Sequence, residues 1–319
     1  MSARAVVLRS LVEDIAVPDA RALCGAQVEL TAQLERLART PDHATLDAAR
    51  ASWKRAQLAW ERVYAFRTGP VVESRALIRA TFWPVRTEAL DQLQHGTVSD
   101  VDALGTDVRG MFALEWLLFG TAADALGDAA QSGDQSRRFA LALAHNVEHY
   151  AVLARDQLGD GTTLIARLQR EPERGIGRFT QLSASSIEVL VHDRLEPLLQ
   201  RGRRSPQLRG AVSGMSGALV GAQLAATERL YLGTTEPGHG LSLLVREAAP
   251  EIDLHLRAMF HTARVSVQTL GAPLSEVAIG EPQHIYAAHA ALKELEKALK
   301  SELASALSMT LTFDAVDGD

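Results

Sequence analysis

The 319-residue chain is 47% hydrophobic and 23% charged, with a formal net charge of −6. Its arginines are scattered instead of gathered on one stripe, which argues against a nucleic-acid partner. No apolar run reaches the roughly eighteen residues that a membrane-spanning helix needs, so no membrane span is predicted. The single cysteine, Cys24, excludes an intrachain disulfide and a cysteine-built metal site.

Abundant Ala and Leu, with only 5% aromatic residues, favour an all-α fold. Residues 1–40 predict two helical stretches broken at Pro18, and the seam containing Trp53 and Trp60 predicts a long helix that ends near residue 66. A sharp bend is expected at Trp83-Pro84, because a proline disfavours helical geometry in the residue before it. Further helices are expected at about 85–95, 110–120, 135–157, 178–200, 213–232, 250–269 and 283–308.

The domain organisation follows from length and from the breaks between helices. A chain of 319 residues exceeds the size at which one core usually stops growing. Residues 171–177 contain a proline and two glycines among charged residues, which is typical of a connection. We therefore expect two tandem domains resembling four-helix bundles, residues 1–170 and 171–319.

The segment 110–120 is apolar on every helical face except the one that Glu115 occupies. Such a helix should be buried, and a buried carboxylate is costly unless a cation, a metal or hydrogen-bond donors meet it. Arg67, Arg75, Arg79 and Arg86 surround the two bends at residues 69–70 and 83–84. One of these arginines is expected to neutralise Glu115, either as a structural ion pair or in a ligand pocket where Glu115, Arg67 and Trp83 converge.

A second pattern concerns the long helix at 135–157. Residues 145–149 read H-N-V-E-H, which matches the H-x-x-E-H zinc motif. A five-residue match also fits an exposed polar helix face. His145 and His149 are therefore only weak candidates for metal ligands, and no metal site is predicted from them.

Several segments resemble the imelysin family in order and spacing. They are W-K-R-A-Q-L-A-W-E-R-V-Y-A-F-R-T-G-P at 53–70, F-W-P at 82–84, G-M-F-A-L-E-W-L-L-F-G at 110–120, R-G-A-V-S-G-M-S at 209–216 and T-F-D-A-V-D-G-D at 312–319. The resemblance implies an all-helical protein of two bundle-like domains, exported to the bacterial periplasm or outer membrane and linked to iron. The family is named for a peptidase, and iron or another divalent metal is the cofactor it would imply.

The family signature is G-x-H-x-x-E, whose His and Glu are the implied metal or active-site pair. Here Gly110 and Glu115 match it, and Phe112 stands at the His position. Because phenylalanine has no lone pair, we expect no catalytic residue and no resident cofactor at this motif. The resemblance then implies a ligand pocket formed by Glu115, Phe112, Gly110, Arg67, Trp83 and Glu61.

These observations predict a non-catalytic, periplasmic imelysin-like protein that binds a ligand or partner in iron uptake or regulation. Exported members of the family carry a leader, and the start Met1-Ser2-Ala3-Arg4 lacks the apolar segment of one. Two alternatives remain open: a metal-dependent peptidase that uses Glu115 as base with His145 or His149, and a structural interaction module.

Overall fold

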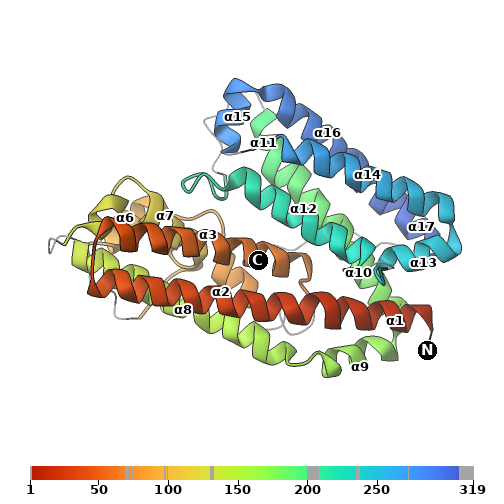
Figure 1. Cartoon of the computed structure of the whole chain (residues 1–319), viewed down its shortest axis with the longest axis horizontal. Helices are drawn as coiled ribbons and strands as arrows, with labels where there is room; N and C mark the ends of the chain where they lie inside the picture. Colours follow the sequence, from red (N-terminus) through yellow and green to blue (C-terminus); the bar gives the residue numbers. More distant parts are fainter. Residues whose placement is uncertain are drawn as a thin grey trace.

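The computed structural model describes residues 2–68, 72, 75–96, 98, 100–129, 133–199, 208–234, 238–271 and 273–308. Within them the fold is all-α, as predicted, and no strand occurs (Figure 1). The bend at residues 69–70 and the run at 312–319 lie outside the described residues.

The helices of the first half of the chain are α1 (Ala3–Ser10), α2 (Val17–Arg39), α3 (His43–Ala65), α5 (Ala76–Thr81), α6 (Thr87–Leu93), α7 (Met111–Phe119) and α8 (Asp134–Leu158). Those of the second half are α9 (Thr162–Arg170), α10 (Pro172–Val189), α11 (Glu196–Leu199), α12 (Ser216–Leu232), α13 (Leu241–Ala248), α14 (Pro250–Gln268), α15 (Leu274–Gly280), α16 (Pro282–Ala298) and α17 (Ala304–Ala306). Wider π-helical turns form η1 (Leu11–Ala16), η5 (Leu190–Leu195) and η6 (Leu299–Leu303), and short 3₁₀ turns form η2 (Thr106–Val108) and η3 (Ala123–Gly127).

The predicted break at Pro18 is wrong, because α1, η1 and α2 form one continuous rod along the molecule (Figure 1). Pro18 lies in the first turn of α2, directly after the π-helical turn η1. A proline lacks the N–H that an α-helix would use and its ring crowds the preceding turn, and a wider turn accommodates both. The backbone at Ala16 and Val17 therefore stays helical.

Two clusters of buried side chains form the core. One joins α2, α3, α5, α7 and α8 around Trp53, Trp60 and Phe112. The other joins α1, α10, α12, α14 and α16 around Phe179, Tyr231 and Phe260. The rod contributes to both, since α1 lies in the second cluster and α2 supplies Leu residues to the first. The division of the chain at residue 171 stays a prediction.

Other features of the second half differ from the predicted boundaries. Residues 172–177 are the first turns of α10 and not a connection, because Pro172 occupies a position where a helix needs no N–H. The shorter helices α9, α13 and α15 were not predicted.

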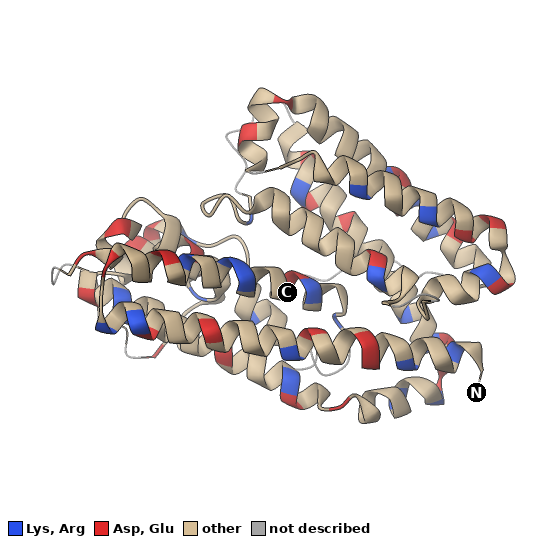
Figure 2. Ribbon diagram, viewed as in Figure 1, with Lys and Arg blue, Asp and Glu red and all other residues tan. Residues whose placement is uncertain are grey.

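Acidic and basic residues are interspersed over both halves (Figure 2). In the described part of the chain, no helix combines the length and the apolarity that crossing a bilayer requires.

Candidate functional site

The glycine that precedes helix α7 allows this helix to approach α5 closely. Gly110 has φ +86°, and a Cβ on this residue would lie 2.6 Å from the carbonyl oxygen of Ala80. Glycine is therefore required for both the backbone angle and the close approach. The indole Nε1 of Trp53 donates to the carbonyl oxygen of Met111 at 2.9 Å, which ties the first turn of α7 to α3.

Glu115 is buried, as predicted, with 1% of its surface exposed. Its Oε1 accepts hydrogen bonds from the hydroxyl of Ser213 at 2.7 Å and from the backbone N–H of Ser213 at 2.9 Å. Burial raises the pKa of Glu115, and the bonds from Ser213 and from the backbone N–H groups of Gly210 and Val212 oppose that rise. The partner of Glu115 is therefore the turn that precedes α12.

The shape of this turn depends on two glycines in left-handed conformation. Gly210 has φ +72° and Gly214 has φ +73°, and the N–H of Met215 donates to the carbonyl oxygen of Gly210 at 2.7 Å. Successive backbone N–H groups in such a turn form a concave site for an anion. Here a carboxylate of the same chain fills that site.

The predicted pairing of Glu115 with an arginine is wrong, because Glu115 is bonded to the Ser213 turn and the candidate arginines lie elsewhere. Arg67 donates to the hydroxyl of Ser185 at 2.8 Å, Arg79 donates to the hydroxyl of Tyr150 at 3.4 Å, and Arg86 pairs with Asp107. Arg75 precedes α5 in a left-handed conformation. Amide and hydroxyl donors satisfy a carboxylate without a counter-charge, so no arginine is needed at Glu115.

Phe112 and Trp83 do lie together, as the predicted pocket requires. Their rings pack edge to face with centroids 5.1 Å apart, and the guanidinium of Arg209 lies 5.4 Å from the centroid of the Phe112 ring. The Phe112 ring thus has a cation over it, Arg209, which the sequence does not single out. Burial lowers the pKa of Arg209 to about 10, with Arg194 adding to the shift and Glu61 opposing it.

Glu61 belongs to a buried polar cluster beside Arg209. Arg194 approaches Glu61 Oε2 at 3.6 Å, and Gln57 donates to Glu61 Oε1 at 3.2 Å. Both Glu61 and Arg194 are almost fully buried. Within the described residues, Arg194 Nε and Gln57 Oε1 have no hydrogen-bond partner. Most buried polar atoms have a hydrogen-bond partner, so these two atoms are exceptions.

Arg67 marks the point where the end of α3 docks on α10. Besides the Arg67 bond to Ser185, Nε of Arg178 donates to the hydroxyl of Thr68 at 2.7 Å. Arg67 also lies over the ring of Tyr64, 4.4 Å from its centroid. Tyr64 interacts electrostatically with Arg209 as well, so Tyr64 links the buried cluster to this docking point.

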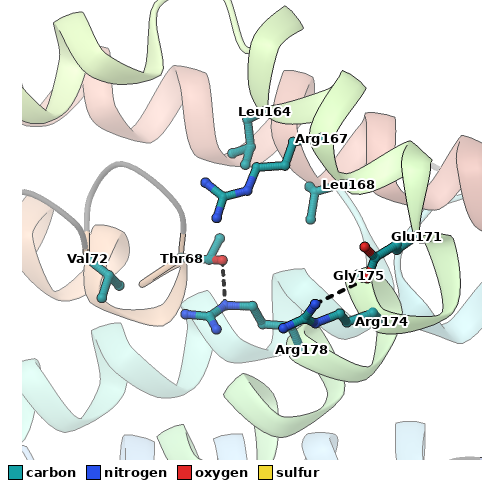
Figure 3. A pocket seen from close by; sticks show the side chains of 9 residues that line it. All are labelled: Thr68, Val72, Leu164, Arg167, Leu168, Glu171, Arg174, Gly175 and Arg178. Carbon is teal, nitrogen blue, oxygen red and sulfur yellow. Dashed lines mark hydrogen bonds and ion pairs between the residues drawn. The ribbon is translucent and has the colours of Figure 1, made fainter.

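Thr68, the residue after Arg67, lines a surface pocket of about 260 Å³. Its polar lining consists of three arginines, one acid and a threonine, and α9 and α10 supply most of it (Figure 3). Glu171 pairs with Arg174 at 3.2 Å, while Arg167 and Arg178 approach the centre of the pocket near Thr68 (Figure 3). The remaining lining residues are Val72, Leu164, Leu168 and Gly175.

The sequence profile of imelysin, peptidase M75, matches residues 16–302. The chain belongs to the imelysin family.

The relatives agree with this membership. Iron-regulated protein A of Synechococcus elongatus is 23% identical over 181 residues, which are 57% of this chain and 45% of that protein. The match therefore spans less than half the length of that curated relative. An imelysin-like protein from Psychrobacter arcticum 273-4 has a similar crystal structure, with a TM-score of 0.77 at 16% identity over 98% of each chain.

A further solved structure shares the fold. The putative iron-regulated protein A precursor of Parabacteroides distasonis ATCC 8503 has a TM-score of 0.79 at 14% identity, over 96% of this chain and 95% of that chain. At such low identity these two structures support the fold alone.

The imelysin metal pair does not fit the donor atoms found here. Phe112 offers no ligand atom, and Glu115 Oε1 already accepts two hydrogen bonds from Ser213. A single buried carboxylate bonded in this way is a poor site for zinc or iron. His145 and His149 lie on an exposed face of α8. The metal-compatible group found among the described residues does not include either of them.

Sequence reasoning missed Ser213, Arg194 and Arg209. Ser213 and Arg209 lie in the 209–216 run that resembles the family, and this run was the available signal. Arg194 carries no such signal, because it lies within a helical stretch like any surface arginine.

Proposed function

We propose that this imelysin-family protein is a non-catalytic binding protein of iron uptake or regulation, located in the periplasm. We further propose that it binds a small carboxylate- or phosphate-bearing ligand in the pocket beside Thr68. The link to iron rests on the names of two similar proteins, iron-regulated protein A of Synechococcus elongatus and the putative iron-regulated protein A precursor of Parabacteroides distasonis. The periplasmic location rests on the family resemblance.

The observation that supports an anionic ligand is the charge of the pocket. Three arginines and one glutamate line it, and the glutamate is already paired with Arg174. Planar guanidinium groups bind carboxylate and phosphate oxygens in pairs, which gives both affinity and orientation. The positive charge continues inward, because Arg67 lies next to Thr68 in the chain. Burial lowers the pKa of Arg67, and the neighbouring charge of Arg178 lowers it further. A bound anion would offset this surplus of positive charge in the pocket lining.

A non-catalytic role is supported by the state of Glu115. A general base needs an accessible carboxylate, and a metallopeptidase needs further ligands around a metal. Glu115 instead accepts bonds from the Ser213 turn and is 1% exposed. Its geometry is that of a group that joins two parts of the fold.

Citrate is a suitable probe because its three carboxylates match the guanidinium groups and its size suits the pocket. We expect isothermal titration of the full chain with citrate to show binding that Arg178→Met weakens by about tenfold to a hundredfold, the usual effect of removing one charged hydrogen bond. Arg246→Met is the matched control, because Arg246 is exposed on α13 and is not among the residues that line the pocket. Equal affinity in both variants, or no binding by the parent, would contradict the proposal and favour a structural interaction module.

The peptidase alternative has its own test. Purified parent and Glu115→Ala proteins are compared for metal content and for hydrolysis of a denatured protein substrate. We expect the same metal content in both and no hydrolysis by either. Metal or hydrolytic activity that is present in the parent and absent from Glu115→Ala would restore the peptidase function.

A further inference from the structure

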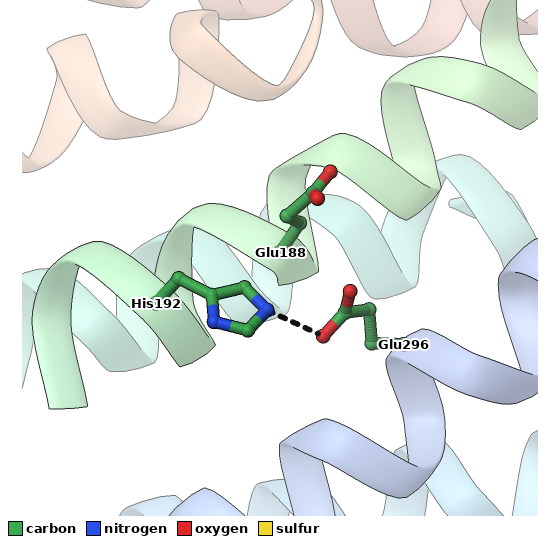
Figure 4. Close-up of side chains that lie close together, drawn as sticks. All are labelled: Glu188, His192 and Glu296. Carbon is green, nitrogen blue, oxygen red and sulfur yellow. Dashed lines mark ion pairs between the residues drawn. The ribbon is translucent and has the colours of Figure 1, made fainter. Parts of the chain in front are cut away.

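A cluster of two carboxylates and an imidazole lies between α10 and α16, outside the segments that resemble the imelysin family. Glu188 is near the end of α10, His192 follows one turn later in η5, and Glu296 is on α16 (Figure 4). One ligand-type atom from each of these three residues lies within 4.8 Å of the others. Glu296 is buried, Glu188 is partly buried and His192 is exposed, so the cluster is reachable from solvent.

The orientation of His192 is the first argument for a cation. Its Nδ1 lies 2.7 Å from Glu196 Oε2, and its Nε2 lies 3.5 Å from Glu296 Oε2. A histidine that donates one ring N–H to a carboxylate presents the lone pair of the other nitrogen, as metal-binding histidines do. That lone pair would then face another carboxylate oxygen. A proton or a bound cation between these two acceptors would stabilise the arrangement.

Lys300 supplies the second argument. Its Nζ lies 2.9 Å from Glu188 Oε1 and 2.6 Å from Glu296 Oε1, so an ammonium group already bridges the two carboxylates. The positions of the carboxylates therefore select a cation. A lysine side chain is long and flexible, and its ammonium group can exchange with a metal ion by rotating into solvent.

A second imidazole lies in the electrostatic neighbourhood of the cluster. His289 is on α16, two helical turns before Glu296, and it interacts electrostatically with His192 and Glu296. Its Nε2 is buried and has no hydrogen-bond partner within the described residues. Imidazole and carboxylate together suit zinc, iron(II) and manganese(II), whereas calcium and magnesium prefer oxygen ligands alone.

We propose that Glu188, His192 and Glu296 form a binding site for a divalent transition-metal ion, at a position for which the ammonium group of Lys300 competes. The site is separate from the Glu115 motif and from the arginine-lined pocket. It does not depend on the proposed function, because binding of the metal requires no anionic ligand.

Zinc is the probe, titrated by calorimetry into chelator-treated full-length protein. We expect the parent to bind one Zn²⁺ at this site, His192→Gln to weaken binding tenfold or more, and Lys300→Met to tighten it several-fold. The opposite signs of these two effects distinguish the site from adventitious binding to surface histidines. His145→Gln is the matched control, because His145 is exposed on α8, and it should leave the zinc affinity unchanged.

Unfolding of each variant is checked without metal by circular dichroism, so that loss of binding is not confused with loss of fold. Arg178→Met should bind zinc as the parent does, which separates this test from that of the anionic ligand. Absence of zinc binding by the parent would overturn the proposal. Unchanged affinity in His192→Gln, or weaker binding in Lys300→Met, would overturn it equally.

Discussion

Two buried carboxylates, Glu115 and Asp253, are satisfied in different ways. Asp253 is 2% exposed and accepts bonds from the hydroxyl of Tyr231 at 2.7 Å, from the hydroxyl of Ser242, and from Nε of Arg257 at 2.8 Å. Glu115 is equally buried, and its hydrogen bonds come from neutral groups of the Ser213 turn. One carboxylate has a cationic partner and the other does not.

The difference shows what each group does for the fold. The partners of Asp253 lie on α12, α13 and α14, so its bonds hold three successive helices of one core together. Burial, and then the bond to Asp253, raise the pKa of the Tyr231 hydroxyl, which keeps it a donor. Glu115 joins α7 to the turn before α12, 98 residues away. Asp253 therefore stabilises one bundle, and Glu115 connects the motif helix to the second half of the chain.

The largest effect is expected from breaking the Asp253 network. Asp253→Ala leaves the Arg257 guanidinium and two hydroxyl groups without their common acceptor, and we expect a loss of about 3–5 kcal/mol in the free energy of unfolding. Urea unfolding at neutral pH measures it. Glu251→Ala is the control, since Glu251 is exposed two positions earlier on the same helix. A loss no larger than that of the control would show that the network contributes little.

A smaller loss is expected at Glu115. Glu115→Ala removes the acceptor of both Ser213 bonds, which leaves buried donors unpaired, and should cost about 1–3 kcal/mol. If the bond to the Ser213 hydroxyl is the main contact, Ser213→Ala in the Glu115→Ala background should cost less than Ser213→Ala alone. A double-mutant cycle from urea unfolding gives this coupling. Strict additivity of the two substitutions would mean that the contact does not contribute to stability.

The fold class and the burial of α7 could be predicted from the sequence, because helical periodicity and apolar composition are local properties. The importance of Phe112 also came from the sequence, as a departure from the family motif. The partner of Glu115 could not be predicted in the same way. Ser213 lies far along the chain in a glycine-containing turn, and no periodic pattern marks a turn as the donor to a distant helix.

Two errors have the same origin. Charge complementarity can be read from residue types and favours arginine as the partner of Glu115, whereas the direction of the backbone N–H groups at Gly210 and Val212 cannot be read from them. A proline usually interrupts a helix and so predicts a break at Pro18, but the π-helical turn η1 that accommodates it leaves no pattern in the residue types. Both features depend on backbone geometry more than on side-chain chemistry.

The smallest predicted effect is the part of the pH dependence of stability that comes from Glu115. The pKa of Glu115 is raised above its ordinary value of 4.5 by burial, so the folded chain retains this proton at a pH where the unfolded chain has lost it. The stability that the proton provides is complete below that ordinary pKa and is lost as the pH rises through the raised value. Relative to Glu115→Gln, which cannot ionise, the parent should therefore become less stable between about pH 4.5 and neutral pH. Urea unfolding of both proteins across this pH range measures the difference in their free energies of unfolding. The contributions of the other carboxylates are the same in both proteins and cancel in this difference. A difference that stays constant, or that changes in favour of the parent as the pH rises, would show that Glu115 is ionised in the folded protein throughout this pH range.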